Sequence, residues 1–200
     1  MMRRPFALMF SLAAVTAVAT ICVSSAAQAH VGGHAGGFTN GLAHPLYGLD
    51  HILAMVAVGI WASQLGRPAL WLLPVTFPLV MSAGALIGWS GLPFPWLEFG
   101  IAGSVIALGA VIAFTIRPTL TISTAAIAVF ALFHGYEHGA ALPANGMPLP
   151  YGLGFVLSTL LLHVAGIAIG LATARPSLRF VTQASGVAIA IAGAGYLFVA

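Results

Sequence analysis

Ionisable side chains at the start of an apolar stretch are the first sign of chemistry in this sequence. His44, Asp50 and His51 open the segment 44–59, which is otherwise almost entirely uncharged. His44 and His51 are seven residues apart, close to two helical turns, so a regular helix would place them on nearly one face. Two imidazoles and a carboxylate are suitable ligands for a divalent metal ion of borderline softness. Pro45 and Gly48 indicate that the first turn of this helix is irregular.

A second group of the same residue types occurs in the segment 133–143. His134, Glu137 and His138 are three and four residues apart, so they share one face of a helix. A structural role alone is a poor explanation for two such groups, because charged and polar side chains are costly within a bilayer. The pattern His134-x-x-Glu137-His138 also fits the inverted motif of zinc proteases, in which the glutamate is the general base.

Three further histidines are weaker candidates for metal binding. His30 and His34 lie in a glycine-rich segment that could capture a metal ion loosely. His163 falls near the middle of an apolar segment, where a single histidine more often makes a hydrogen bond between helices.

The composition requires a membrane protein that is all α-helical. Hydrophobic residues make up 60% of the chain, charged residues 4%, and the mean hydropathy is +1.08. A typical soluble chain is about a quarter charged. The formal charge of +3 is too small to indicate nucleic-acid binding. Six apolar segments of roughly bilayer-spanning length follow one another, at about residues 46–65, 69–90, 97–116, 120–142, 151–174 and 180–199.

The N-terminus and the arginines predict the topology. Residues 1–29 have the features of a cleavable signal peptide, ending in Ala27-Gln28-Ala29. Residues 30–43 would then be a flexible periplasmic segment rich in histidine and glycine, and residues 44–200 the six-helix transmembrane domain. After residue 29, arginine occurs only in the first, third and fifth connections between spans, which the positive-inside rule places in the cytoplasm. Both mature termini are therefore expected on the outer side of the membrane, with both histidine groups in the outer half.

Small residues recur four apart in four of the apolar segments, a spacing typical of closely packed membrane helices. These pairs are Gly84/Gly88, Gly100/Ser104, Gly135/Gly139 and Gly166/Gly170.

The two motifs together resemble those of the HupE/UreJ family of nickel and cobalt permeases. The resemblance covers residues 30–200 and rests on the order H-P-x-x-G-x-D-H at 44–51 and on Phe133-His134-Gly135-Tyr136 with His138-Gly139. It implies metal-handling roles for His44, Asp50, His51, His134 and His138. The chain departs from the family pattern at two places, where Glu137 replaces a usually small residue and Ala141 replaces an acid.

These observations predict a secondary-type permease, not an enzyme, in the bacterial inner membrane. It would import Ni²⁺ or Co²⁺, with Zn²⁺ also able to bind, through His44, Asp50, His51, His134, Glu137 and His138. No permanently bound cofactor, nucleic acid or ATP-binding subunit is expected; the partners are the metal ion and the bilayer, and a homo-oligomer is compatible with the sequence. The sequence leaves open which metal-dependent system is served, since urease, hydrogenase and cobalamin pathways would all fit. Two alternatives remain: an intramembrane zinc metallohydrolase using His134 to His138, and a membrane metal sensor that does not transport.

Overall fold

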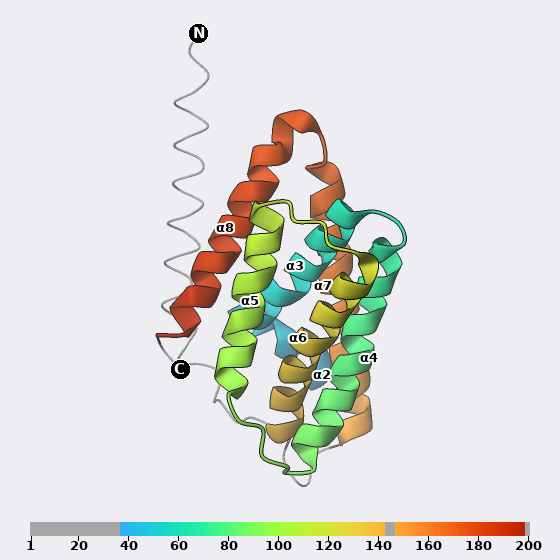
Figure 1. Ribbon diagram of the computed structural model, residues 1–200. Coiled ribbons are helices and arrows are strands. Elements are labelled where there is room, and N and C mark those ends of the chain that lie inside the picture. Colours follow the sequence, from blue (N-terminus) through green and yellow to red (C-terminus); the bar gives the residue numbers. More distant parts are fainter. Residues whose placement is uncertain (1–36, 143–146, 199–200) are drawn as a thin grey trace.

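A computed structural model describes residues 37–142 and 147–198 (Figure 1), and within these ranges the chain forms helices and no strand. The predicted all-α class is therefore confirmed for the described part of the chain. In order, the elements are α2 (Phe38–Ala43), the 3-10 turn η1 (His44–Leu46), α3 (Leu49–Leu65), α4 (Ala69–Trp89), α5 (Leu97–Ala113), α6 (Leu120–Ala140), α7 (Pro148–Ala172), the 3-10 turn η2 (Pro176–Leu178) and α8 (Arg179–Tyr196).

Each of the six predicted apolar segments overlaps one of the helices α3 to α8, of which α7 and α8 begin one to three residues before the predicted segments. Four of them, α4, α6, α7 and α8 with its preceding turn, are long and apolar enough to cross a membrane. A fifth span is counted if α2, η1 and α3 form one broken crossing, and α5 is a shorter apolar helix of 17 residues. The described residues thus show four to five candidate spans, which makes this a multi-pass membrane protein. The full set of six spans, the signal peptide and the outer position of the termini stay predictions.

The entrance to α3 differs from the prediction. The segment 38–46 meets α3 at an angle of 83°. Pro45 and the extended backbone of Gly48 interrupt the helix between His44 and Asp50, so the histidines do not share a face of one helix. The prediction of an irregular first turn is confirmed, whereas that of nearly one helical face was wrong.

The predicted flexible segment 30–43 is also wrong in its last part, because residues 38–43 form helix α2. This short helix is held against the start of α7 by two glycines. A Cβ atom on Gly41 would come within 1.9 Å of the Tyr151 carbonyl oxygen, and one on Gly154 within 2.0 Å of the Phe38 carbonyl oxygen. Such close backbone contact fixes the position of the residues that follow α2. His30, His34 and the proposed signal peptide lie outside the described residues.

The helices pack in pairs, α4 with α6, α5 with α8 and α3 with α7. The closest pair confirms the prediction from small residues. A Cβ atom on Gly135 would lie 2.0 Å from the Met81 carbonyl oxygen, and one on Gly139 would lie 1.9 Å from that of Ala85. Glycine is therefore required along this contact, which brings the backbone of α6, and with it the second histidine group, close to α4.

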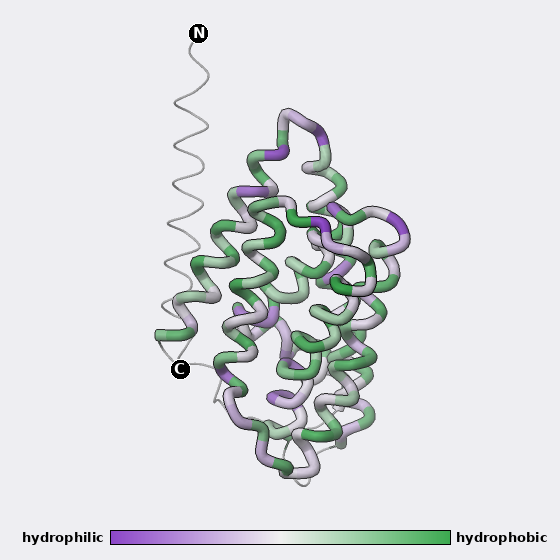
Figure 2. Tube along the Cα trace, viewed as in Figure 1, coloured by the Kyte–Doolittle hydropathy of each residue, from purple (hydrophilic) through white to green (hydrophobic). Residues whose placement is uncertain are grey.

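The two ends of the bundle differ in charge. The connections that carry Arg67, Arg117 and Arg175 follow α3, α5 and α7, and all three lie at the same end of the bundle (Figure 1). Hydrophobic residues follow the lengths of the helices, while strongly hydrophilic ones mark these connections (Figure 2). This arrangement agrees with the grouping of arginines on one side of a membrane that the sequence predicts.

Candidate metal centre

The bend before α3 turns His44 back over the start of that helix. The His44 ring lies 6.3 Å from the His51 ring and 5.0 Å from the His138 ring, measured between centroids. It also contacts Tyr151 and Phe155 of α7. The two histidines of the first motif are therefore neighbours because of the bend between them.

Asp50 and His51 form a close pair at the first turn of α3. The Asp50 Oδ1 atom lies 2.8 Å from His51 Nδ1. A carboxylate can only accept a hydrogen bond, so a proton on Nδ1 suits this contact, and a neutral ring would then offer Nε2 as the electron-pair donor. Gly48 makes room for the pair, since a Cβ atom there would lie 2.6 Å from His51 Nδ1 and 2.8 Å from Asp50 Oδ1.

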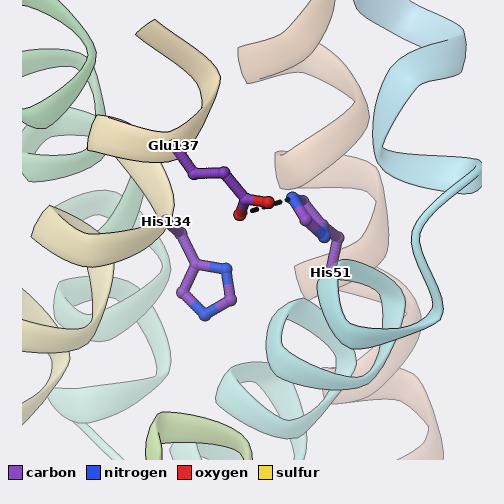
Figure 3. A group of neighbouring side chains, drawn as sticks. All are labelled: His51, His134 and Glu137. Carbon is purple, nitrogen blue, oxygen red and sulfur yellow. Dashed lines mark ion pairs between the residues drawn. The ribbon is translucent and has the colours of Figure 1, made fainter. Parts of the chain in front are cut away.

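The other ring nitrogen of His51, Nε2, faces the residues of the second motif on α6. His51 Nε2 lies 3.6 Å from the Glu137 Oε2 atom, and the His51 and His134 ring centroids are 5.6 Å apart. One ligand atom from each of His51, His134 and Glu137 lies within 4.8 Å of the others (Figure 3). A proton on Nε2, or a metal cation shared between the two atoms, would satisfy both the ring nitrogen and the carboxylate. Two imidazoles and one carboxylate from α3 and α6 thus converge on one small volume.

His138 completes the cluster on the side of His44. Its ring lies 4.4 Å from the His51 ring and 4.2 Å from the Phe155 ring. The side chain is buried, and neither ring nitrogen has a hydrogen-bond partner among the described residues. Buried polar atoms are normally paired, so two free nitrogens here are consistent with a ligand that the protein receives from outside.

Ser104 of α5 orients His134. The Ser104 hydroxyl donates to the Ile101 carbonyl oxygen at 2.7 Å, and its oxygen lies 2.9 Å from His134 Nε2. Because its single hydrogen is used, the hydroxyl must accept from Nε2, which then carries the proton of the neutral ring. The Nδ1 atom of His134, which has no partner among the described residues, is left as the donor for a metal ion.

The other residues of α6 in this stretch hold the helix in place. Tyr136, between the candidate ligands, points to the connection between α4 and α5, where its hydroxyl donates to the Leu92 carbonyl oxygen at 2.5 Å. Its ring stacks on Phe94. These contacts fix the end of α6 from the side opposite the cluster.

The structure brings all six of the main candidate residues together and leaves His163 apart. The six form one connected cluster at the starts of η1 and α3 and near the end of α6: His44, Asp50, His51, His134, Glu137 and His138. His163 lies deeper, beyond the ring of Phe77. Glu98, in the first turn of α5, is exposed.

Sequence reasoning missed three residues at the site. Ser104 was recognised only as a small packing residue, and its spacing from Gly100 gives no sign of its hydroxyl contact to His134. Tyr151 and Phe155, which contact His44 and His138, lie four residues apart on one face of α7. This aromatic pair is ordinary for a membrane helix, so only the packing shows that it borders the cluster.

The chemistry of the cluster is that of nitrogen and oxygen donors. Imidazole and carboxylate suit Ni²⁺, Co²⁺ and Zn²⁺, and no thiol contributes within the described residues. The cluster lies at the start of α3 and near the end of α6. Arg67 follows the last residue of α3 and Arg117 precedes the first residue of α6, so the cluster lies toward the end of the bundle opposite the arginine-bearing connections. The fold and this geometry define a multi-pass helical membrane protein with a buried group of potential metal ligands.

The comparisons with known proteins supply the family. The family model described as "HupE / UreJ protein" matches residues 17–196. Protein HupE from Rhizobium leguminosarum bv. viciae is 44% identical over 184 residues, which cover 91% of this chain and 95% of the relative. This chain belongs to the HupE/UreJ family, which confirms the resemblance found from the two motifs. No solved structure matches the chain.

Proposed function

We propose that this protein is a permease that imports Ni²⁺ or Co²⁺ across the bacterial inner membrane through the cluster of His44, Asp50, His51, His134, Glu137 and His138. The observation that carries the proposal is the convergence of His51, His134 and Glu137, whose ligand atoms lie within 4.8 Å of one another. Membership in the HupE/UreJ family is consistent with nickel or cobalt transport and with a protein that is not an enzyme.

The proposed path begins on the outer side. His30 and His34 gather the hydrated ion before it reaches His44, which is half-buried at the bend before α3. The ion then exchanges water for imidazole nitrogen and carboxylate oxygen between α3 and α6. A bare dication is very unfavourable in a low-dielectric interior. The carboxylates of Asp50 and Glu137 offset its two positive charges, so the ion can lose water within the bundle.

The roles within the cluster differ. The proposed direct ligands are His51 Nε2, a Glu137 oxygen and His134 Nδ1, since one ligand atom from each of these three residues lies close to the others. Asp50 and Ser104 hold the opposite nitrogens of the two rings and so fix their orientation. The acid of the family pattern corresponds to the position of Ala141. Glu137, about one helical turn earlier, supplies the carboxylate in its place.

Uptake of radioactive nickel into proteoliposomes tests the proposal. The wild-type protein should accumulate nickel inside the vesicles with time, and His51→Ala should not, while protein-free vesicles give the background. Binding to the protein without internal accumulation would contradict transport and favour the sensor. Hydrolysis of a membrane peptide that depends on Glu137, with no accumulation, would instead favour the metallohydrolase, which the family comparison does not support.

A further inference from the structure

His163, in the middle of α7, is a fully buried histidine that the proposed cluster does not use. Its relative exposure is 0%, and neither ring nitrogen has a hydrogen-bond partner among the described residues. A histidine that served only to link two helices would make that link through a hydrogen bond. The ring interacts with the Pro74 carbonyl of α4 but makes no full hydrogen bond to it, so a link between helices does not account for both ring nitrogens.

His163 lies on the inner side of the cluster, separated from it by one aromatic ring. The Phe77 ring of α4 lies 5.9 Å from the His134 ring and 5.3 Å from the His163 ring. The backbone of His163 crosses α3 at Gly59, where a Cβ atom would lie 2.2 Å from the His163 carbonyl oxygen. Gly59 is eight residues beyond His51, or about 12 Å along the helix axis, toward the arginine-bearing end of α3.

Oxygen atoms without a normal partner accompany this histidine. Pro78 of α4 has no N–H group, so the Pro74 carbonyl oxygen lacks its intrahelical hydrogen bond, and this carbonyl is a polar group that interacts with the His163 ring. The Thr159 hydroxyl, one turn before His163 on the same helix, is fully buried and has no partner among the described residues. One imidazole, one carbonyl without an intrahelical partner and one hydroxyl are thus placed at this level of the bundle.

We propose that His163, Thr159 and the Pro74 carbonyl form a second, inner binding station for the transported dication, and that the Phe77 side chain separates it from the outer cluster. The proposal rests on the proposed function and extends it by giving the ion a position beyond the outer ligands. The inner station has no carboxylate and fewer strong donors, so it holds a dication more weakly than the outer cluster does. Weaker binding on the inner side favours release toward the cytoplasm.

The test compares nickel binding with nickel uptake in three variants. His163→Leu removes the ring nitrogens at similar volume, and Thr159→Val replaces only the hydroxyl. Ser158→Ala is the matched control, because Ser158 is the buried neighbour of Thr159 and points to another side of α7. Equilibrium binding is measured on purified protein in detergent, and initial uptake rates are measured in proteoliposomes over a range of nickel concentrations.

We expect His163→Leu to lower the maximal uptake rate by about tenfold or more, the scale of losing one metal-site interaction, while the affinity of the outer cluster stays unchanged. Thr159→Val should lower the rate several-fold, and Ser158→Ala should match the wild type. Retained nickel affinity shows that a variant is folded. If His163→Leu does not fold, the uptake rate of Thr159→Val tests the inner station instead.

Wild-type uptake rates in both His163→Leu and Thr159→Val would overturn the inner station but leave the permease intact. Loss of outer-cluster binding in a folded His163→Leu protein would also overturn it, since His163 would then act through the outer site. Absence of uptake in the wild-type protein would overturn the proposed function, and the inner station with it.

Discussion

Replacing Ser104 with alanine should weaken metal binding without touching any proposed ligand. The Ser104 oxygen lies 2.9 Å from His134 Nε2 and fixes the proton there, which leaves Nδ1 free to bind the ion. In Ser104→Ala the His134 ring is free to change tautomer or orientation. Loss of such an outer contact typically costs 10- to 100-fold in metal affinity, or about 1.4 to 2.8 kcal/mol.

The same substitution should also destabilise the protein. His134 is fully buried, so removing its partner leaves an N–H group unpaired, at a cost of about 1 to 3 kcal/mol. Serine and alanine are similar in volume, so no large cavity contributes. Metal should restore part of the lost stability, because a ligand that binds the folded state stabilises it.

The matched control is Ser82→Ala on α4. The Ser82 hydroxyl also donates to a carbonyl oxygen of its own helix, that of Pro78 at 2.7 Å. Isothermal titration calorimetry with Ni²⁺ on both variants and the wild type measures the affinity, and thermal unfolding measures the stability. An unchanged nickel affinity in Ser104→Ala would refute the assignment of the His134 tautomer, as would an equal loss in Ser82→Ala.

Four further outcomes follow from the same contacts. Asp50→Asn keeps the shape but offers His51 a weaker acceptor, so nickel affinity measured by calorimetry should fall by about tenfold or more; an affinity equal to the wild type would remove Asp50 from the site. Gly48→Ala places a methyl group 2.6 Å from His51 Nδ1 and should reduce uptake in proteoliposomes, and a normal rate would show that the pair can move aside. Gly139→Ala should lower the thermal unfolding temperature, because its Cβ atom would lie 1.9 Å from the Ala85 carbonyl oxygen; an unchanged temperature would contradict the tight packing of α4 on α6. Uptake should fall as the pH is lowered from neutrality to about 5.5, because protons compete with the metal for imidazole nitrogen, and a flat profile would count against histidine ligation.

The helices and the meeting of the two motifs could be predicted from the sequence for physical reasons. Apolar segments of bilayer length, separated by proline, glycine and arginine, leave little choice in where helices begin and end. The distribution of arginines fixes the relative direction of α3 and α6. It therefore places His51 and His134 in the same half of the bundle, where the structure brings their rings within 5.6 Å.

Other features depend on packing that the sequence pattern does not report. The bend of 83° before α3 follows from Pro45 and Gly48 together with the docking of α2 on α7; the two residues predicted an irregular first turn but not the size of the bend. The hydroxyl of Ser104 meets His134 only because α5 packs beside α6. The position of Phe77 between two histidines likewise requires three helices to be placed at once.

X-ray absorption spectroscopy of the nickel-loaded protein shows whether the buried histidine and carboxylate cluster binds the transported ion. We expect the nickel ion to be surrounded by nitrogen and oxygen, with the multiple-scattering features of at least two imidazoles and no sulfur. In His51→Ala one imidazole should be lost from that shell. A spectrum of nickel surrounded by water alone, or one unchanged by His51→Ala, would show that the cluster does not bind the ion in this way.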